Sequence, residues 1–150
     1  MRWATARRGA VLAGAVLVGL CLVAPAPASA ARGVEVRIVD APAELAAGDS
    51  PRPLVVEATR PGRSECLKVR WSLVLRLSGI TLDQVQVVRV EEDGAFAVDL
   101  VADGDTARLT DIEFDPGTLC DDQTVTARYE VSVAGDVPAG ELAVTAEAYD

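Results

Sequence analysis

The chain has 150 residues, half of them hydrophobic, and a formal net charge of −9. An acidic surface argues against nucleic acid and anionic membranes as partners, because both are bound through a basic face. The chain has no histidine, which removes the commonest general base of hydrolytic and nucleophilic catalysis. We therefore expect a protein that is not an enzyme and that needs no cofactor.

The first thirty residues have the organisation of a secretory signal peptide. A basic start precedes an uncharged apolar run over 9–23, and Ala-Ser-Ala at 28–30 is a typical cleavage sequence. We expect residues 1–30 to be removed, with Cys21 among them. Residues 31–150 would then form one secreted domain, extracellular or associated with the cell wall.

Two alternatives for this leader stay open. The apolar run could serve as a membrane anchor, although Pro25 and Pro27 limit its helix to about fifteen residues, which is short for a span. The pair Arg7-Arg8 could direct export by the twin-arginine route. Once the leader is cleaved, no contact with a membrane is expected.

Cys66 and Cys120 are the two cysteines of the secreted part. In an oxidising compartment they predict a disulfide bond. A nucleophilic cysteine would need a nearby base, and the chain has no histidine to supply it. Cys66 opens a strand and Cys120 follows a Pro-Gly turn, so the bond should hold the start of a strand to a loop.

The first part of the domain predicts two neighbouring strands, over 34–40 and 54–59, joined by a loop rich in proline and glycine. A longer strand over 66–78 follows, in which apolar and polar residues alternate with period two. Its apolar face carries six large side chains: Leu67, Val69, Trp71, Leu73, Leu75 and Leu77. This phase predicts that Trp71 lies in the core and does not stack on a sugar.

The segment 85–91 is apolar in both phases, which predicts a β-bulge or an exchange between sheets. A Glu-Asp-Gly turn then predicts a hairpin with its glycine in the left-handed region. In the register that pairs apolar residues, Val90 lies opposite Phe96 and Val88 opposite Val98. The next strand would turn three apolar side chains inward: Phe96, Val98 and Leu100.

Asp111, Glu113 and Asp115 alternate with Ile112 and Phe114. We expect the two apolar side chains to point inward and the three carboxylates to point outward into solvent. A calcium site is the alternative, since calcium prefers several oxygen ligands at close range. No EF-hand or glycine-aspartate repeat surrounds these residues, so the solvent-facing interpretation is favoured.

Two regular strands close the chain, over 124–134 and 141–149, and Tyr149 is out of phase with the inward residues of its strand. Its ring is therefore expected to be exposed. The whole domain has seven or eight strands and no helical pattern. The expected fold class is all-β: an antiparallel, immunoglobulin-like sandwich of two sheets over one core, with one disulfide.

Residues 124–150, T-V-T-A-R-Y-E-V-S-V-A-G-D-V-P-A-G-E-L-A-V-T-A-E-A-Y-D, resemble the closing strands of immunoglobulin-like modules in bacterial secreted and cell-wall-anchored proteins. In those modules a V-P-x-G turn joins two strands rich in Val, Thr and Ala. The resemblance implies a spacer, adhesion or carbohydrate-associated role outside the cell. It brings no catalytic residues with it.

Three functions fit the sequence. The first is a secreted, non-enzymatic surface or adhesion/spacer module of the cell envelope, with an extracellular protein or a cell-wall component as its partner. The second is a soluble carrier or binding module for a small ligand or glycan, which predicts a concave apolar pocket. The third is a secreted inhibitor of an extracellular enzyme, which predicts a rigid protruding loop, with 115–122 as the candidate.

Overall fold

The computed structural model describes residues 19–25, 29–30 and 33–150. Most of the predicted leader, including the pair Arg7-Arg8, lies outside the described residues. Within those residues, no helix combines the length and the apolar character that a membrane crossing requires.

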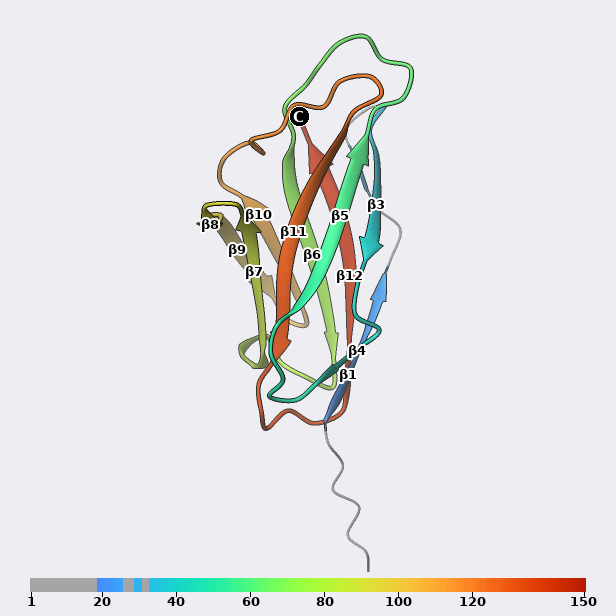
Figure 1. The fold of residues 1–150 in the computed structure, drawn as a ribbon. Helices are drawn as coiled ribbons and strands as arrows, with labels where there is room; N and C mark the ends of the chain where they lie inside the picture. The colour runs from blue at the N-terminus through green and yellow to red at the C-terminus, as the bar shows by residue number, and fades with distance from the viewer. Residues whose placement is uncertain (1–18, 26–28, 31–32) are drawn as a thin grey trace, which may run out of the picture.

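The described residues form two β-sheets that lie face to face. In Figure 1 the long strands of one sheet pass in front of those of the other. Sheet A contains, in spatial order, β4 (Glu44–Ala46), β1 (Leu20–Pro25), β12 (Gly140–Tyr149), β6 (Arg70–Ser78), β10 (Thr106–Asp111) and β9 (Val98–Asp103), with β2 (Ser29–Ala30) also paired to β12. Sheet B contains β3 (Glu35–Asp40), β5 (Arg52–Thr59), β11 (Thr124–Val133), β7 (Val85–Glu91) and β8 (Gly94–Ala95). The predicted all-β sandwich of two sheets is confirmed.

Pairing within the sheets is antiparallel except at one place. β1 and β2 both run parallel to β12, one after the other along its length. A single turn of 3-10 helix, η1 (Leu82–Gln84), leads into β7. The fold therefore places a segment of the predicted leader, Leu20–Pro25, inside sheet A.

The core consists of the residues that the alternating pattern turns inward. On β6 the side chains of Trp71, Leu73, Leu75 and Leu77 are all at most 3% exposed. β5, β11 and β12 bury one face each in the same way. Strands covered on one face bury alternate residues, so the predicted phases of these four strands are confirmed, as is the burial of Trp71.

The disulfide joins Cys66 to Cys120, residues separated by 54 positions in the sequence. Next to it, Leu67 and Leu119 pair through two backbone hydrogen bonds, and Leu119 is fully buried. The bond therefore holds the approach to β6 against the loop that precedes β11, as predicted.

The hairpin after β7 differs from the predicted register. Val90 lies opposite Ala95, and Glu91 lies opposite Gly94, so the turn has two residues and Phe96 is not paired with Val90. The chain then leaves sheet B and enters sheet A as β9. β7 itself pairs with β11 without interruption, so the exchange between sheets occurs after the hairpin and the predicted bulge within 85–91 is absent.

Leu100 lies opposite the buried Leu109 and lines the opening between the sheets, on the inner face as predicted, yet its side chain is 52% exposed. Its neighbour Val101, opposite Arg108, is 59% exposed. β9 is the last strand of sheet A, and sheet B ends on that side in the two-residue strand β8. The inner face of β9 is therefore left partly uncovered.

Candidate functional site

The carboxylates of the 111–115 segment do not lie where the alternation predicted them. β10 turns Ala107, Leu109 and Asp111 toward the core, so Asp111 is 2% exposed and Ile112 is 52% exposed. Asp115 is also buried, whereas Phe114 is 46% exposed. The phase of β10 is set by its pairing with β6 and β9 along its whole length, and this pairing decides which face residue 111 takes.

The two buried carboxylates surround a buried arginine, Arg89 on β7, whose side chain is 0% exposed. Its Nη2 atom lies 2.8 Å from Asp115 Oδ2, and its Nη1 atom lies 2.5 Å from Glu91 Oε1. The Nε atom is 3.7 Å from Asp111 Oδ1. One interior cation thus faces three carboxylates. The Asp115 carboxylate accepts a hydrogen bond from it, whereas neither oxygen of Asp111 has a hydrogen-bond partner among the described residues.

Two aromatic rings and two further donors complete this buried charge cluster. The Arg89 guanidinium lies 5.2 Å from the centroid of Phe96 and 5.6 Å from that of Tyr129, within the range of cation–π attraction. Trp71 Nε1 donates to Asp115 Oδ2 at 3.0 Å, and the Gly117 N–H donates to Oδ1 at 2.8 Å. Both oxygens of Asp115 are therefore fixed in direction.

Burial changes the acidity of two members of the cluster. It raises the pKa of Asp111 to about 6, an effect that the nearby Arg89 charge only partly offsets. It also raises the pKa of the Tyr129 hydroxyl, and the charge of Asp111 adds to that rise. The cluster is closed to solvent at Arg89 and Asp111, whereas the Glu91 side chain is 28% exposed.

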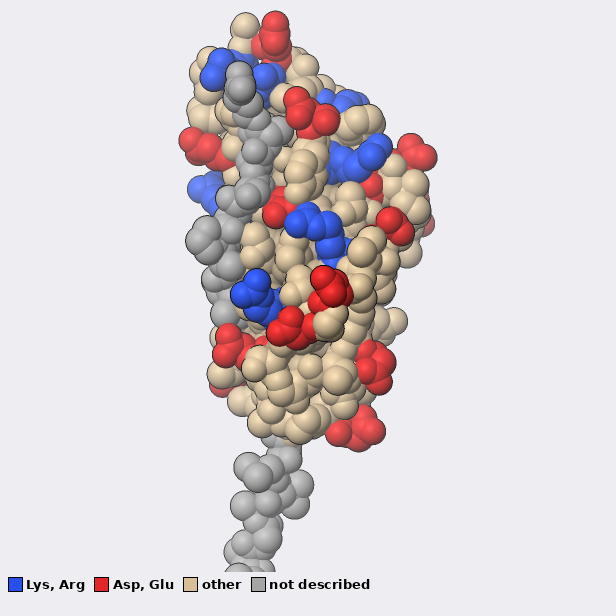
Figure 2. All heavy atoms as spheres, turned by 180° about the vertical axis from the view of Figure 1, so that it is seen from behind, with Lys and Arg blue, Asp and Glu red and all other residues tan. Residues whose placement is uncertain are grey.

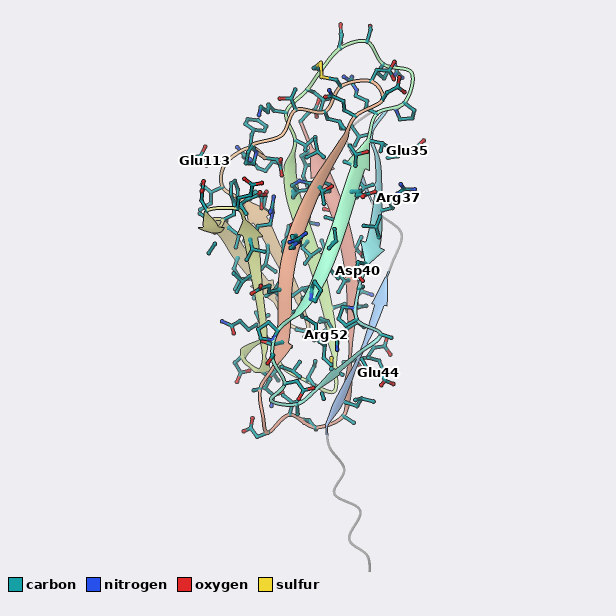
Figure 3. All side chains as sticks on the ribbon, in the orientation of Figure 1. Glu35, Arg37, Asp40, Glu44, Arg52 and Glu113 are labelled. Carbon is teal, nitrogen blue, oxygen red and sulfur yellow. A yellow bond between two sulfur atoms is a disulfide. The ribbon has the colours of Figure 1, made fainter. Side chains whose placement is uncertain are left out.

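The calcium alternative is not supported by this geometry. Glu113 is exposed and lies on the outside of its loop (Figure 3), away from the buried Asp111 and Asp115. Across the part of the chain that the structure describes, no group of three or more Asp, Glu or Cys side chains is arranged to hold a metal ion; the carboxylates of Glu91, Asp111 and Asp115 gather around Arg89. Arg89 supplies the positive charge that the buried carboxylates require.

A second group of polar side chains lies on the outer face of sheet A, the face turned away from sheet B. Figure 2 views the molecule from this side and shows basic and acidic side chains interspersed with uncharged ones. The centre of the group is Arg108 on β10. Its Nη1 atom lies 3.0 Å from Tyr149 Oη and 3.1 Å from Ser72 Oγ, and it also contacts the carboxylate of Glu147.

The strand register produces this network. Ser72 on β6 lies opposite Thr110 on one side and opposite Glu147 on the other, and its hydroxyl is 3.0 Å from that of Thr110. Tyr149 donates its hydroxyl proton to Glu147. Because cross-strand neighbours on one face lie side by side, these side chains on β6, β10 and β12 form one contiguous network.

Hydrogen bonds and charge shift the pKa values of two members of this network, Glu147 and Tyr149. Burial would raise the pKa of Glu147, but hydrogen bonds from Arg108 and Tyr149 hold it below its ordinary value. Burial and the Glu147 carboxylate together raise the pKa of Tyr149. At neutral pH Glu147 is therefore ionised, and it holds its two neighbours in place.

Two aromatic rings border the network. Tyr149 is 41% exposed, as predicted, and Phe114 is 46% exposed. The Arg70 guanidinium stacks over the Phe114 ring at 4.9 Å from its centroid. Together with Ser72, Arg108 and Glu147, these residues define what we call the outer-face site.

The cavities offer little to a small ligand. A largely apolar opening of about 180 Å³ lies between the sheets at Leu82, Leu100 and Leu109, which is less than the usual volume of a ligand pocket, about 300 Å³ or more. A larger hollow of about 520 Å³ beside η1 is open to solvent and is lined mostly by polar and small residues. Neither matches the concave apolar pocket that a carrier would need.

The local sequence pattern does not single out Arg89, Arg108 or Glu147. The alternation does place Arg108 and Glu147 on the polar faces of their strands, which indicates that both side chains lie on the outer face of a sheet. Arg89 continues the inward phase of Val85 and Val87, but Val88 and Val90 make the opposite phase equally apolar.

A comparison with protein-family models and searches of curated proteins and of solved structures find no match for this chain.

Proposed function

We propose that this chain is a secreted, non-enzymatic module of the cell envelope that binds an extracellular protein or a cell-wall component through the outer-face site. The signal-like leader, the disulfide and the immunoglobulin-like character of residues 124–150 support secretion and a role at the cell surface. The observation that carries the binding proposal is the ordered Arg108–Glu147–Tyr149 network on the outer face of sheet A.

The composition of the outer-face site is that of a binding surface. Tyrosine and arginine are the residues that most often dominate binding energy at interfaces, because each offers a large contact area together with a polar group. Tyr149 and Arg108 are already held by Glu147 and Ser72. A partner would therefore immobilise few free side chains, which lowers the entropic cost of association.

The other two functions have less support. The inhibitor alternative needs the loop 115–122 to protrude, but Asp115 and Leu119 anchor it to the core. The carrier alternative needs a concave apolar pocket, and the apolar opening beside Leu100 is small. The outer-face site exposes the rings of Phe114 and Tyr149 above the largely buried Ser72 and Glu147, which suits a macromolecular surface or a glycan chain.

The test measures binding of the secreted protein to walls isolated from the producing cell. We expect saturable cosedimentation that falls about tenfold or more in a Phe114→Ala, Tyr149→Ala double variant, since these two rings are the exposed aromatic side chains of the site. Arg128→Ala, an exposed change on sheet B, is the matched control. Equal retention of wild type and double variant, with intact folding of both, would refute the outer-face site.

A further inference from the structure

β1 occupies a slot in sheet A between β12 and β4. It pairs in parallel with β12, where Cys21 lies opposite Gly140 and Val23 opposite Leu142, and its first half pairs antiparallel with β4. Beyond the paired residues, the N–H of Val23 donates to the carbonyl of Ala43 at 3.1 Å. A strand in this slot therefore has hydrogen-bonding neighbours on both sides.

The slot is selective for side chains. Cys21 is 0% exposed within the core, and Leu45 on β4 is buried beside it, whereas Leu22 points outward and is 47% exposed. At Gly19 the backbone passes so close to Val137 that a Cβ atom would lie 1.9 Å from its carbonyl oxygen. The slot therefore accepts glycine, then a small apolar side chain at the second position after it, in an extended segment.

The segment that fills the slot belongs to the predicted leader. Cleavage after Ala30 would remove β1 together with β2, which pairs with Glu147 and Ala148. The edge of β12 would then be unpaired along its length, and β4 would have no partner in sheet A. An unpaired edge beside an opening into the core readily takes up another strand.

We propose that this slot is a strand-acceptor site, which in the secreted protein takes up an extended apolar segment of another polypeptide, parallel to β12. The inference rests on the proposed secretion and cleavage of the leader. The occupant is defined by what the slot holds here: a glycine, a small apolar side chain two residues later, and a further apolar side chain two residues after that. In the unprocessed chain β1 closes the same site from within.

The experiment begins with the secreted protein recovered after export of the full chain, whose intact mass defines its first residue. The probe is a dye-labelled, N-acetylated peptide of residues 17–27 with a lysine tail for solubility and Cys21→Ala, which prevents exchange with the Cys66–Cys120 disulfide. Binding is followed by fluorescence anisotropy. The control peptides carry Cys21→Asp, which would bury a carboxylate, or Gly19→Val, which would collide with Val137.

We expect saturable binding of the Cys21→Ala peptide, with a dissociation constant below about 100 µM, and binding weaker by about tenfold or more for each control peptide. The refolded full chain should also bind the peptide weakly, because its own β1 competes at high effective concentration.

Three outcomes would overturn the proposal. A processed protein that takes up no peptide, or that binds all three peptides equally, shows that the slot does not accept strands. A dimer that excludes the peptide shows that a second copy closes the edge. A secreted protein that still contains Gly19–Pro25 shows that β1 is a permanent strand, and in that case the outer-face site remains untouched as the proposed binding surface.

Discussion

The guanidinium of Arg89 on sheet B lies 2.8 Å from the carboxylate of Asp115, which sits in the loop that follows the sheet A strand β10. This ion pair joins the two sheets through the interior. Trp71 Nε1 donates to the same Asp115 oxygen from β6, so three separate parts of the chain meet at one atom.

Replacing Arg89 by methionine should destabilise the domain by about 3–5 kcal/mol, because it leaves buried carboxylates without their cation. Urea unfolding at pH 7 would measure the loss. Arg76→Met, on the exposed outer face of β6, is the control and should change stability by less than about 0.5 kcal/mol. A similar small loss for both variants would contradict the assigned role of Arg89.

Asp111→Asn should alter how stability depends on pH. The pKa of Asp111 is raised to about 6 in the folded protein from about 3.9 in an unfolded chain, so the folded state binds the proton more tightly. Wild-type stability then falls as pH rises from about 4 to 6, relative to a variant that does not titrate there.

The measurement is the difference in unfolding free energy between wild type and Asp111→Asn at several pH values. We expect this difference to shift in favour of the variant between pH 4 and 6 and to be constant above that range. Arg89, Glu91 and Asp115 surround the site and are present in both proteins, so the comparison isolates the Asp111 carboxyl. A difference that does not change with pH would show that Asp111 titrates normally.

Tyr149→Phe removes the hydroxyl that joins Arg108 to Glu147 and should cost about 1 kcal/mol at neutral pH. The folded pKa of Glu147 is lowered, so its contribution to stability is present above its unfolded pKa of about 4.3 and is lost as pH falls through the folded value. The cost of the substitution should therefore shrink in acid. Denaturant unfolding at pH 7 and pH 3 would test this, and an equal cost at both values would count against the network.

Replacing Cys66 and Cys120 together by serine should lower stability by about 4 kcal/mol, the loop-entropy estimate for their separation of 54 residues. Thermal unfolding would show the loss. Wild type unfolded in the presence of a reductant should match the variant without it. A variant with wild-type stability would mean that the Leu67–Leu119 bridge suffices to hold this end of the sandwich.

The sequence predicts the long strands well because each has one solvent-exposed face and one buried face. On β6 and β11 every second residue is apolar and buried, so the period-two pattern determines both the element and its phase. β12 was predicted for the same reason. Alternation is a local property, which is why a single sequence suffices to detect it.

Where the local pattern is ambiguous, the sequence does not determine the structure. The residues 112–115 alternate as a strand does, yet they form a loop, because the pairing of β10 with β6 stops at Thr110 and its pairing with β9 stops at Asp111. The sequence pattern of the leader segment is ambiguous too. Its apolar residues fit a signal peptide and a buried strand equally well, and only the open edge of β12 shows where Leu20–Pro25 can pair.

Arg89 also bears on how the chain finds its correct alignment. β7 carries valines on both faces, at 85 and 87 on one side and at 88 and 90 on the other, so hydrophobic burial distinguishes poorly between the observed pairing with β11 and one shifted by a single residue. A shift by one residue would place Arg89 in water and bring Val88 and Val90 into the core. Asp111 and Asp115 would then be buried without a cation beside them. The buried Arg89 thus raises the free energy of the shifted pairing, which the valines alone would not disfavour, and so favours the correct register of β7 on β11.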